Sequence, residues 1–146
     1  MGAATLSATF EEACGRHASI TALVTPVESI TYGDLLARSR RFAGALVAAG
    51  VERGDRVAVW LPNGVDWLVA HWGTALAGGV VVPIGTRNRG PEVHHVLAQS
   101  GASALVMVDR FLKSNYLAML DAARSGVGLL RKSSSGGPPE RRFRWG

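Results

Sequence analysis

Short apolar segments that alternate with amphipathic segments constrain the fold of this chain more than any other feature of its 146 residues. The apolar segments are 56–61, 80–82 and 104–108, and segments with helical periodicity lie before and between them. Strands that are apolar on both faces and joined by amphipathic helices are typical of right-handed β-α-β units. We therefore predict an α/β fold with alternating β-α-β units and a mostly parallel sheet.

Local signals indicate where the helices begin and end. A hairpin is predicted over 22–32, and Thr31 is the expected N-cap of the first long helix, with Asp34 three residues further on. Asn63 is expected to cap the second helix, and Pro91 stands in the first turn of the third. Shorter helices are predicted over residues 10–17 and 114–123.

The positive charge of the chain is confined to its last residues. The formal net charge is +5, yet residues 1–123 carry ten basic and ten acidic residues. Residues 124–146 carry six basic residues against Glu140 alone. The body of the chain therefore has no general electrostatic reason to bind a polyanion, and we expect no nucleic-acid partner.

Neither a signal peptide nor a membrane anchor is indicated. The first residues lack a basic region and a continuous apolar run. The uncharged stretch between Trp67 and Arg87 is long enough to span a membrane, but Gly78, Gly79 and Pro83 interrupt it, which favours a helix followed by a buried strand. The single cysteine, Cys14, excludes an internal disulfide. We therefore expect a cytoplasmic protein without a transmembrane segment.

Residues 125–146 differ in composition from residues 1–124. They are rich in Gly, Ser, Pro and Arg and show no periodicity after Leu130, so we predict a folded domain over 1–124 and a disordered tail over 125–146. The chain has far more arginine than lysine, a bias typical of GC-rich coding DNA, and out-of-frame translation of such DNA yields a composition like that of the tail. Our hypothesis is that the tail results from a frameshift or truncation.

Four segments, 29–42, 54–63, 75–84 and 86–101, carry recognisable motifs. The first holds Ile-Thr-Tyr followed by an arginine-rich helix, the second reads Gly-Asp-Arg-Val-Ala-Val-Trp-Leu-Pro-Asn, the third contains Ala-Gly-Gly and Val-Pro-Ile, and the fourth runs from Thr-Arg to Ser-Gly. Each motif alone is common. Together, in this order and spacing over about residues 9–123, they resemble the AMP-forming acyl-CoA ligases of the adenylate-forming superfamily.

The resemblance implies an incomplete N-terminal portion of the ligase N-domain. The whole enzymes use ATP and Mg²⁺ to convert a carboxylic acid to an acyl-adenylate, from which CoA displaces AMP. Their phosphate loop (S-G-T-T-G-x-P-K-G) and their Y-G-x-T-E and Y-x-T-G-D motifs are not found in these 146 residues. We therefore expect a truncated, inactive chain that holds no cofactor of its own and contains neither a catalytic nor a metal-binding residue.

Arg87 is the one candidate binding residue. It follows the strand end that contains Pro83, where α/β folds place ligands. The resemblance implies that it lies on the side from which CoA approaches, and the alternative is an exposed loop arginine. Gly85, two residues earlier, departs from the family pattern, which has Asn or another polar residue there.

Other suggestive residues favour structural roles. Segment 133–139 resembles a phosphate loop, but Glu140 stands where a lysine is needed, and Gly126-Val127-Gly128 fails the dinucleotide pattern at Arg131. Without a further ligand cluster, no metal or nucleophilic site is expected at Cys14, His17, His71, His94 or His95. Core packing is the expected role of Trp60, Trp67 and Trp72.

Three functions stay open on the sequence alone. The first is a ligase fragment, inactive by itself, and the second is a non-catalytic α/β binding or interaction module derived from the ligase fold. The third is a neutral domain whose basic tail contacts RNA or an anionic membrane.

Overall fold

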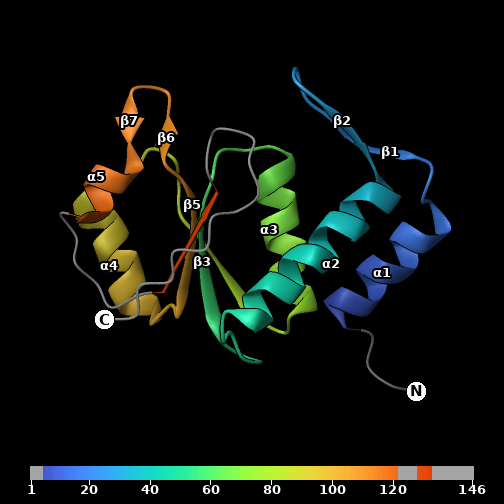
Figure 1. Ribbon diagram of the computed structural model, residues 1–146, viewed down its shortest axis with the longest axis horizontal. Coiled ribbons are helices and arrows are strands. Elements are labelled where there is room, and N and C mark those ends of the chain that lie inside the picture. Colours follow the sequence, from blue (N-terminus) through green and yellow to red (C-terminus); the bar gives the residue numbers. More distant parts are fainter. Residues whose placement is uncertain (1–4, 122–127, 133–146) are drawn as a thin grey trace. The chain divides into compact units, whose positions relative to one another are not determined.

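Three strands predicted from the sequence pair in parallel in the computed structural model, which describes residues 5–121 and 128–132 (Figure 1). Strand β3 (Arg56–Trp60) lies between β4 (Val80–Pro83) and β5 (Ala104–Val108). Both neighbours run parallel to it. The predicted α/β fold with a mostly parallel sheet is therefore confirmed.

A fourth strand, β8 (Gly128–Lys132), pairs in parallel with the other edge of β5. These five residues lie within the range that we predicted to be a disordered tail, and for them the prediction is wrong. Pairing supplies hydrogen bonds to the backbone of β5, and this gain depends on a partner strand rather than on periodicity within 128–132. Residues 122–127 and 133–146 lie outside the described residues.

The elements group into two units. One comprises Met1–Arg53 and Asn63–Gly79, and the other comprises Gly54–Pro62 and Val80–Gly146. The first unit contains α1 (Leu6–Arg16), β1 (Thr21–Val24), β2 (Ser29–Thr31), α2 (Tyr32–Ala48) and α3 (Val65–Leu76). The second contains the parallel sheet together with α4 (Gly90–Ser100), β6 (Arg110–Phe111), β7 (Ser114–Asn115) and α5 (Tyr116–Asp121).

One face of the sheet forms the core of the second unit with α4 and α5, which lie on the same side of β5 in Figure 1. Alternate strand residues share a face, so the side chains of Ala58 and Trp60 point the same way. Spacing by four residues places Val93 and Leu97 on one side of α4. The buried members of this core are Ala58, Trp60, Ile84, Val93, Leu97, Ala102, Leu105, Met107 and Tyr116.

Helix α4 begins and ends with partners for its free backbone groups. The backbone N–H of Arg89 donates to the carboxylate of Glu92 at 2.9 Å, and Gly101 closes the helix with a φ of 59°. The guanidinium of Arg56 donates to the carbonyl oxygens of Ser100 at 2.9 Å and Gly101 at 3.0 Å. A cation at this end also interacts favourably with the helix dipole.

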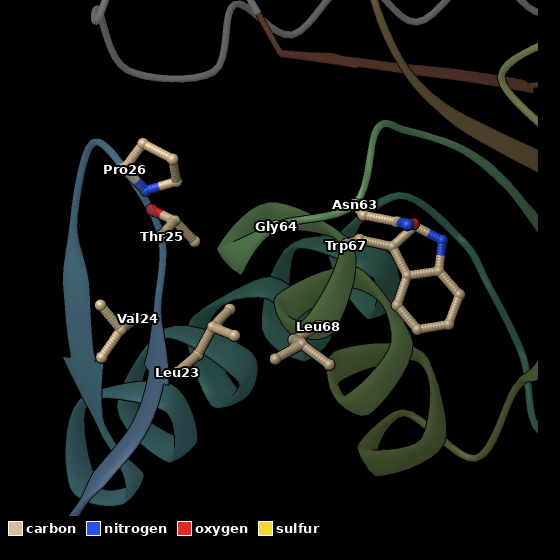
Figure 2. Close-up of a pocket in the computed structure, with 8 residues that line it drawn as sticks. All are labelled: Leu23, Val24, Thr25, Pro26, Asn63, Gly64, Trp67 and Leu68. Carbon is tan, nitrogen blue, oxygen red and sulfur yellow. The ribbon is translucent and has the colours of Figure 1, made fainter.

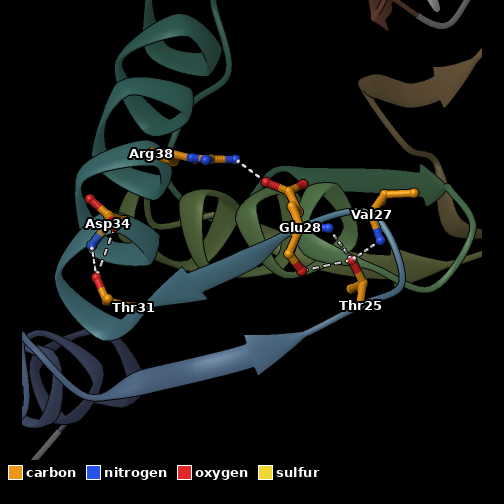
Figure 3. Close-up of polar contacts among 6 residues, drawn as sticks. All are labelled: Thr25, Val27, Glu28, Thr31, Asp34 and Arg38. Carbon is orange, nitrogen blue, oxygen red and sulfur yellow. Dashed lines mark hydrogen bonds and ion pairs between the residues drawn. The ribbon is translucent and has the colours of Figure 1, made fainter.

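The hairpin of the first unit leads directly into α2. The N–H of Asp34 donates to the hydroxyl of Thr31 at 3.2 Å, and that hydroxyl donates to the Asp34 carboxylate at 2.9 Å (Figure 3). The predicted N-cap is therefore confirmed. The Arg38 guanidinium of α2 reaches back to Glu28 beside β2 at 3.1 Å, a half-exposed ion pair worth at most about 1 kcal/mol.

Helices α2 and α3 approach closely at Gly73. A Cβ atom at this position would lie 2.7 Å from Cδ1 of Phe42 and 2.8 Å from the carbonyl oxygen of Ser39. One buried apolar cluster of this unit comprises Phe10, Cys14, Ile30, Leu35, Leu36 and Val65. The ring of Trp72 stacks on Phe10 with the centroids 4.0 Å apart, so α3 also contacts α1.

Two local predictions need correction. Gly64, not Asn63, is the N-cap of α3, and no side chain caps this helix. The helix predicted over 114–123 begins only at Tyr116, because Ser114 and Asn115 pair with β6 as strand β7. The Asn115 side chain then accepts from the N–H of Ala118 at 3.1 Å, which explains why the helix starts after it.

The uncharged stretch that raised the question of a membrane span divides as predicted. Its first part belongs to α3 and its second to β4, and Gly78, with a φ of 78°, terminates the helix between them. Within residues 5–121 and 128–132, every helix is too short or too polar to cross a membrane.

Replacement of Gly73 by alanine is expected to destabilise the chain by about 1–3 kcal/mol, because the new methyl group overlaps the Ser39 carbonyl and the Phe42 ring. Chemical unfolding followed by circular dichroism measures this change.

Gly44→Ala is the matched control, since Gly44 is exposed on α2 and a Cβ there meets nothing within 4 Å. It is expected to stabilise the helix by about 0.5–1 kcal/mol. Equal effects of the two substitutions would contradict the close approach at Gly73.

Candidate functional site

The loop between β4 and α4 occupies the position where parallel sheets bind ligands. It comprises residues 84–89 and begins at the carboxyl end of β4, beside the carboxyl end of β3. Arg87 is exposed in this loop. The predicted candidate residue therefore lies in an accessible segment at the edge of the sheet formed by the carboxyl ends of the strands, where α/β folds generally bind ligands.

A stacked aromatic pair lies beneath this loop. The rings of Trp60 and Tyr116 are nearly parallel, with centroids 3.9 Å apart, and both side chains are fully buried. The indole N–H of Trp60 donates to the backbone carbonyl oxygen of Gly85 at 3.1 Å. The hydroxyl of Tyr116 donates to the backbone carbonyl oxygen of Thr86 at 3.0 Å. The backbone N–H of Asn88 also donates to the Gly85 carbonyl, at 3.0 Å.

The arginines of the loop have different roles. Arg89 lies at the N-terminus of α4, and its guanidinium donates to the carbonyl oxygen of Arg87 at 3.1 Å. The guanidinium of Arg89 is therefore engaged with the loop itself. The structure places the Arg87 side chain on the surface, so a cation is presented at this edge of the sheet.

Burial raises the pKa of the Tyr116 phenol above its ordinary value, and the positive charge of Arg89 opposes this shift. The phenol is therefore neutral at physiological pH and retains the proton that it donates to Thr86.

A second candidate is an apolar groove of about 400 Å³ in the first unit. Figure 2 shows the hairpin on one side of it and the first turns of α3 on the other. Its apolar walls are Leu23, Val24, Pro26, Trp67 and Leu68, and its remaining lining residues are Thr25, Asn63 and Gly64. The groove therefore offers apolar contact and no charged side chain.

Two polar side chains at or beside this groove have defined surroundings. The Thr25 hydroxyl accepts from the N–H of Glu28 at 3.0 Å and donates to the Glu28 carbonyl at 2.9 Å, which closes the hairpin turn (Figure 3). The imidazole of His71 stacks on Trp67 with centroids 5.3 Å apart, and burial lowers its pKa. The groove lining contains no charged side chain, whereas the β4–α4 loop presents Arg87, so we take the loop as the better candidate site.

The other suggestive residues are not brought together. Cys14 is buried, and burial raises the pKa of its thiol, which disfavours the reactive thiolate. His94 and His95 are both exposed on α4. Within residues 5–121 and 128–132, no three His, Cys, Asp or Glu side chains form a metal-binding group. Residues 126, 127 and 133–139, including the segment that resembles a phosphate loop, lie outside the described residues.

Sequence reasoning assigned Trp60 to the core and Tyr116 to a helix, but it missed their shared contact with the loop. Trp60 is buried as expected, whereas Trp67 and Trp72 are only partly buried. The one available signal was Gly85, whose carbonyl accepts from Trp60. A Cβ at this position would lie 3.0 Å from the side-chain oxygen of Asn88.

Comparison with known proteins identifies related sequences. The family model described as "AMP-binding enzyme" matches residues 10–137. A methyl-dioxo-octahydro-indenyl-propanoyl:CoA ligase of Rhodococcus jostii (strain RHA1) is 35% identical over 116 residues, 80% of this chain and 22% of its own length. The long-chain-fatty-acid–CoA ligase of Escherichia coli O6:H1 is 40% identical over 103 residues, 70% of this chain and 18% of its own.

A solved structure shows the same fold. The N-terminal domain of FACL13 from Mycobacterium tuberculosis superposes with a TM-score of 0.78 at 27% identity, over 90% of this chain and 34% of that one. Fold and sequence together define an N-terminal part of an AMP-forming ligase. The chain belongs to the AMP-binding enzyme family. It spans about a fifth of the length of the two curated relatives.

Proposed function

We propose that these 146 residues contribute the N-terminal part of an enzyme that joins a carboxylic acid to CoA through an acyl-adenylate, with ATP and Mg²⁺ as co-reactants. The observation that carries the proposal is the family match over residues 10–137. The named relatives are CoA ligases of a fatty acid and of a bicyclic propanoic acid, so the proposed substrate is a carboxylic acid with a largely apolar body.

Arg87 is the proposed contact for CoA within these residues. It is exposed at the carboxyl end of β4, and its charge complements the phosphate groups of CoA. The loop contains no Cys, Lys, His, Asp or Glu side chain and therefore supplies no general base. Its contribution is therefore binding of the nucleotide portion of CoA, whereas the bond-forming steps need groups that these residues do not contain.

The chain by itself is proposed to be non-catalytic, and its proposed location is the cytoplasm. The phosphate loop and the two other adenylation motifs are not found in the 146 residues. The lone, buried Cys14 is compatible with a reducing compartment.

The chain is expected to show no ATP–pyrophosphate exchange in the presence of mixed carboxylic acids and Mg²⁺, because the lysine and acid that bind the phosphates and the metal are missing from it. A complete acyl-CoA ligase, assayed in parallel, shows that the conditions support exchange. Exchange by the purified chain above a heat-denatured sample would refute the proposal that it is non-catalytic.

Arg87→Ala is expected to weaken binding of CoA about ten- to a hundredfold, because a charge-assisted contact to a phosphate contributes about 1.5–3 kcal/mol and 1.4 kcal/mol corresponds to a factor of ten. Isothermal titration calorimetry of CoA into the chain measures the affinity. Arg41→Ala, which removes the same charge from an exposed position on α2, is the control. If both variants bind CoA as tightly as the parent chain, Arg87 is not a CoA contact.

A further inference from the structure

Three consecutive carbonyl groups at the start of the β4–α4 loop each accept a hydrogen bond from a different side chain. The donors are the Trp60 indole for Gly85, the Tyr116 hydroxyl for Thr86 and the Arg89 guanidinium for Arg87, at 3.1, 3.0 and 3.1 Å. They come from the end of β3, the start of α5 and the start of α4. Two of these donors, Trp60 and Tyr116, come from segments 25 and 30 residues away from their acceptors in the chain.

We propose that Trp60 and Tyr116 are positioning residues that hold the β4–α4 loop in its ligand-binding conformation before a ligand arrives. Their contact with the ligand is indirect, since both side chains are fully buried and act through the backbone of residues 85 and 86. This inference rests on the proposed function of Arg87 as a contact for a phosphate of CoA.

The ring stack makes the two donors a single unit. Two large side chains with centroids 3.9 Å apart, buried among Ala58, Leu105 and Met107, have little rotational freedom. Their polar atoms are consequently fixed in space, and the two carbonyl groups that they bind are fixed with them. The peptide group immediately before Arg87 is therefore held by the core of the unit rather than by the loop.

Prior ordering of a loop increases affinity because the entropy cost of fixing it is not incurred on binding. The hydrogen bonds to the three carbonyl oxygens also reduce the electrostatic repulsion between these oxygens and an anionic ligand. An oxygen that accepts a hydrogen bond repels an approaching phosphate less than an unpaired one does. Both effects favour an anion at Arg87, and the contribution of Tyr116 to them requires its neutral, proton-donating form.

Tyr116→Phe tests the proposal with the smallest change, because it removes the hydroxyl and keeps the stacked ring. We expect binding of adenosine 3′,5′-bisphosphate, the phosphate-bearing nucleotide part of CoA, to weaken about three- to tenfold. Tyr32→Phe is the matched control, since Tyr32 is the other tyrosine of the chain and lies in the first unit. Titration calorimetry reports affinity, and a thermal melt reports whether each variant is folded.

A double-mutant cycle with Arg87→Ala separates a positioning role from a merely structural one. If Tyr116 acts through Arg87, Tyr116→Phe causes no further loss of affinity in the Arg87→Ala background. An equal loss in both backgrounds would overturn the proposal. Loss with Arg87→Ala but none with Tyr116→Phe would also overturn it while leaving the proposed function of Arg87 intact, and no loss with Arg87→Ala would refute that function itself.

Hydrogen exchange of the Asn88 amide tests the same proposal on the unaltered chain, so it does not depend on how a variant folds. This N–H donates to the carbonyl of Gly85 that Trp60 also holds. A loop that is ordered before the ligand binds protects the Asn88 amide in the free chain. Its exchange rate is then expected to change by less than about threefold when the nucleotide is added. Free exchange that becomes protected only with the nucleotide would show that the ligand, rather than the aromatic pair, orders the loop.

Discussion

Parallel pairing of β3 along both of its edges is the constraint on which the second unit depends. A strand in this position has its backbone donors and acceptors satisfied by β4 and β5, so it can be buried without leaving polar groups unpaired. Parallel strands end at the same edge of a sheet. This pairing therefore brings three segments distant in sequence to one place: the last residue of β3, the loop after β4, and the chain that follows β5.

The candidate site is a direct result of this arrangement. Trp60 ends β3 with its side chain on the face that α4 and α5 cover, and Tyr116 begins α5. Because both rings are in the core, their single polar atoms need partners there, and the carbonyl groups of residues 85 and 86 supply them. Burial of two aromatic side chains thus also fixes the backbone that presents Arg87. Stability of the unit and order of the proposed binding loop have the same origin.

The sequence predicted those features that depend on neighbouring residues. Strands β3, β4 and β5 follow from their apolar composition, the start of α2 from Thr31 with Asp34, and the first turn of α4 from Pro91. The four ordered motifs predicted the family. One of them contains Arg87, the residue predicted to bind a ligand. What failed or was missed depends on distant residues. Strand β8 needs the open edge of β5, and the Tyr116 hydroxyl finds its acceptor 30 residues earlier in the chain.

Mapping of CoA on the chain by NMR tests the central claim most directly. Backbone amide shifts would be followed as CoA is added to the isotopically labelled chain. The account predicts that the largest changes occur at residues 85–90, the loop that carries Arg87 and the first residue of α4. Changes concentrated at Leu23, Trp67 and Leu68 around the apolar groove, with none in the loop, would contradict it.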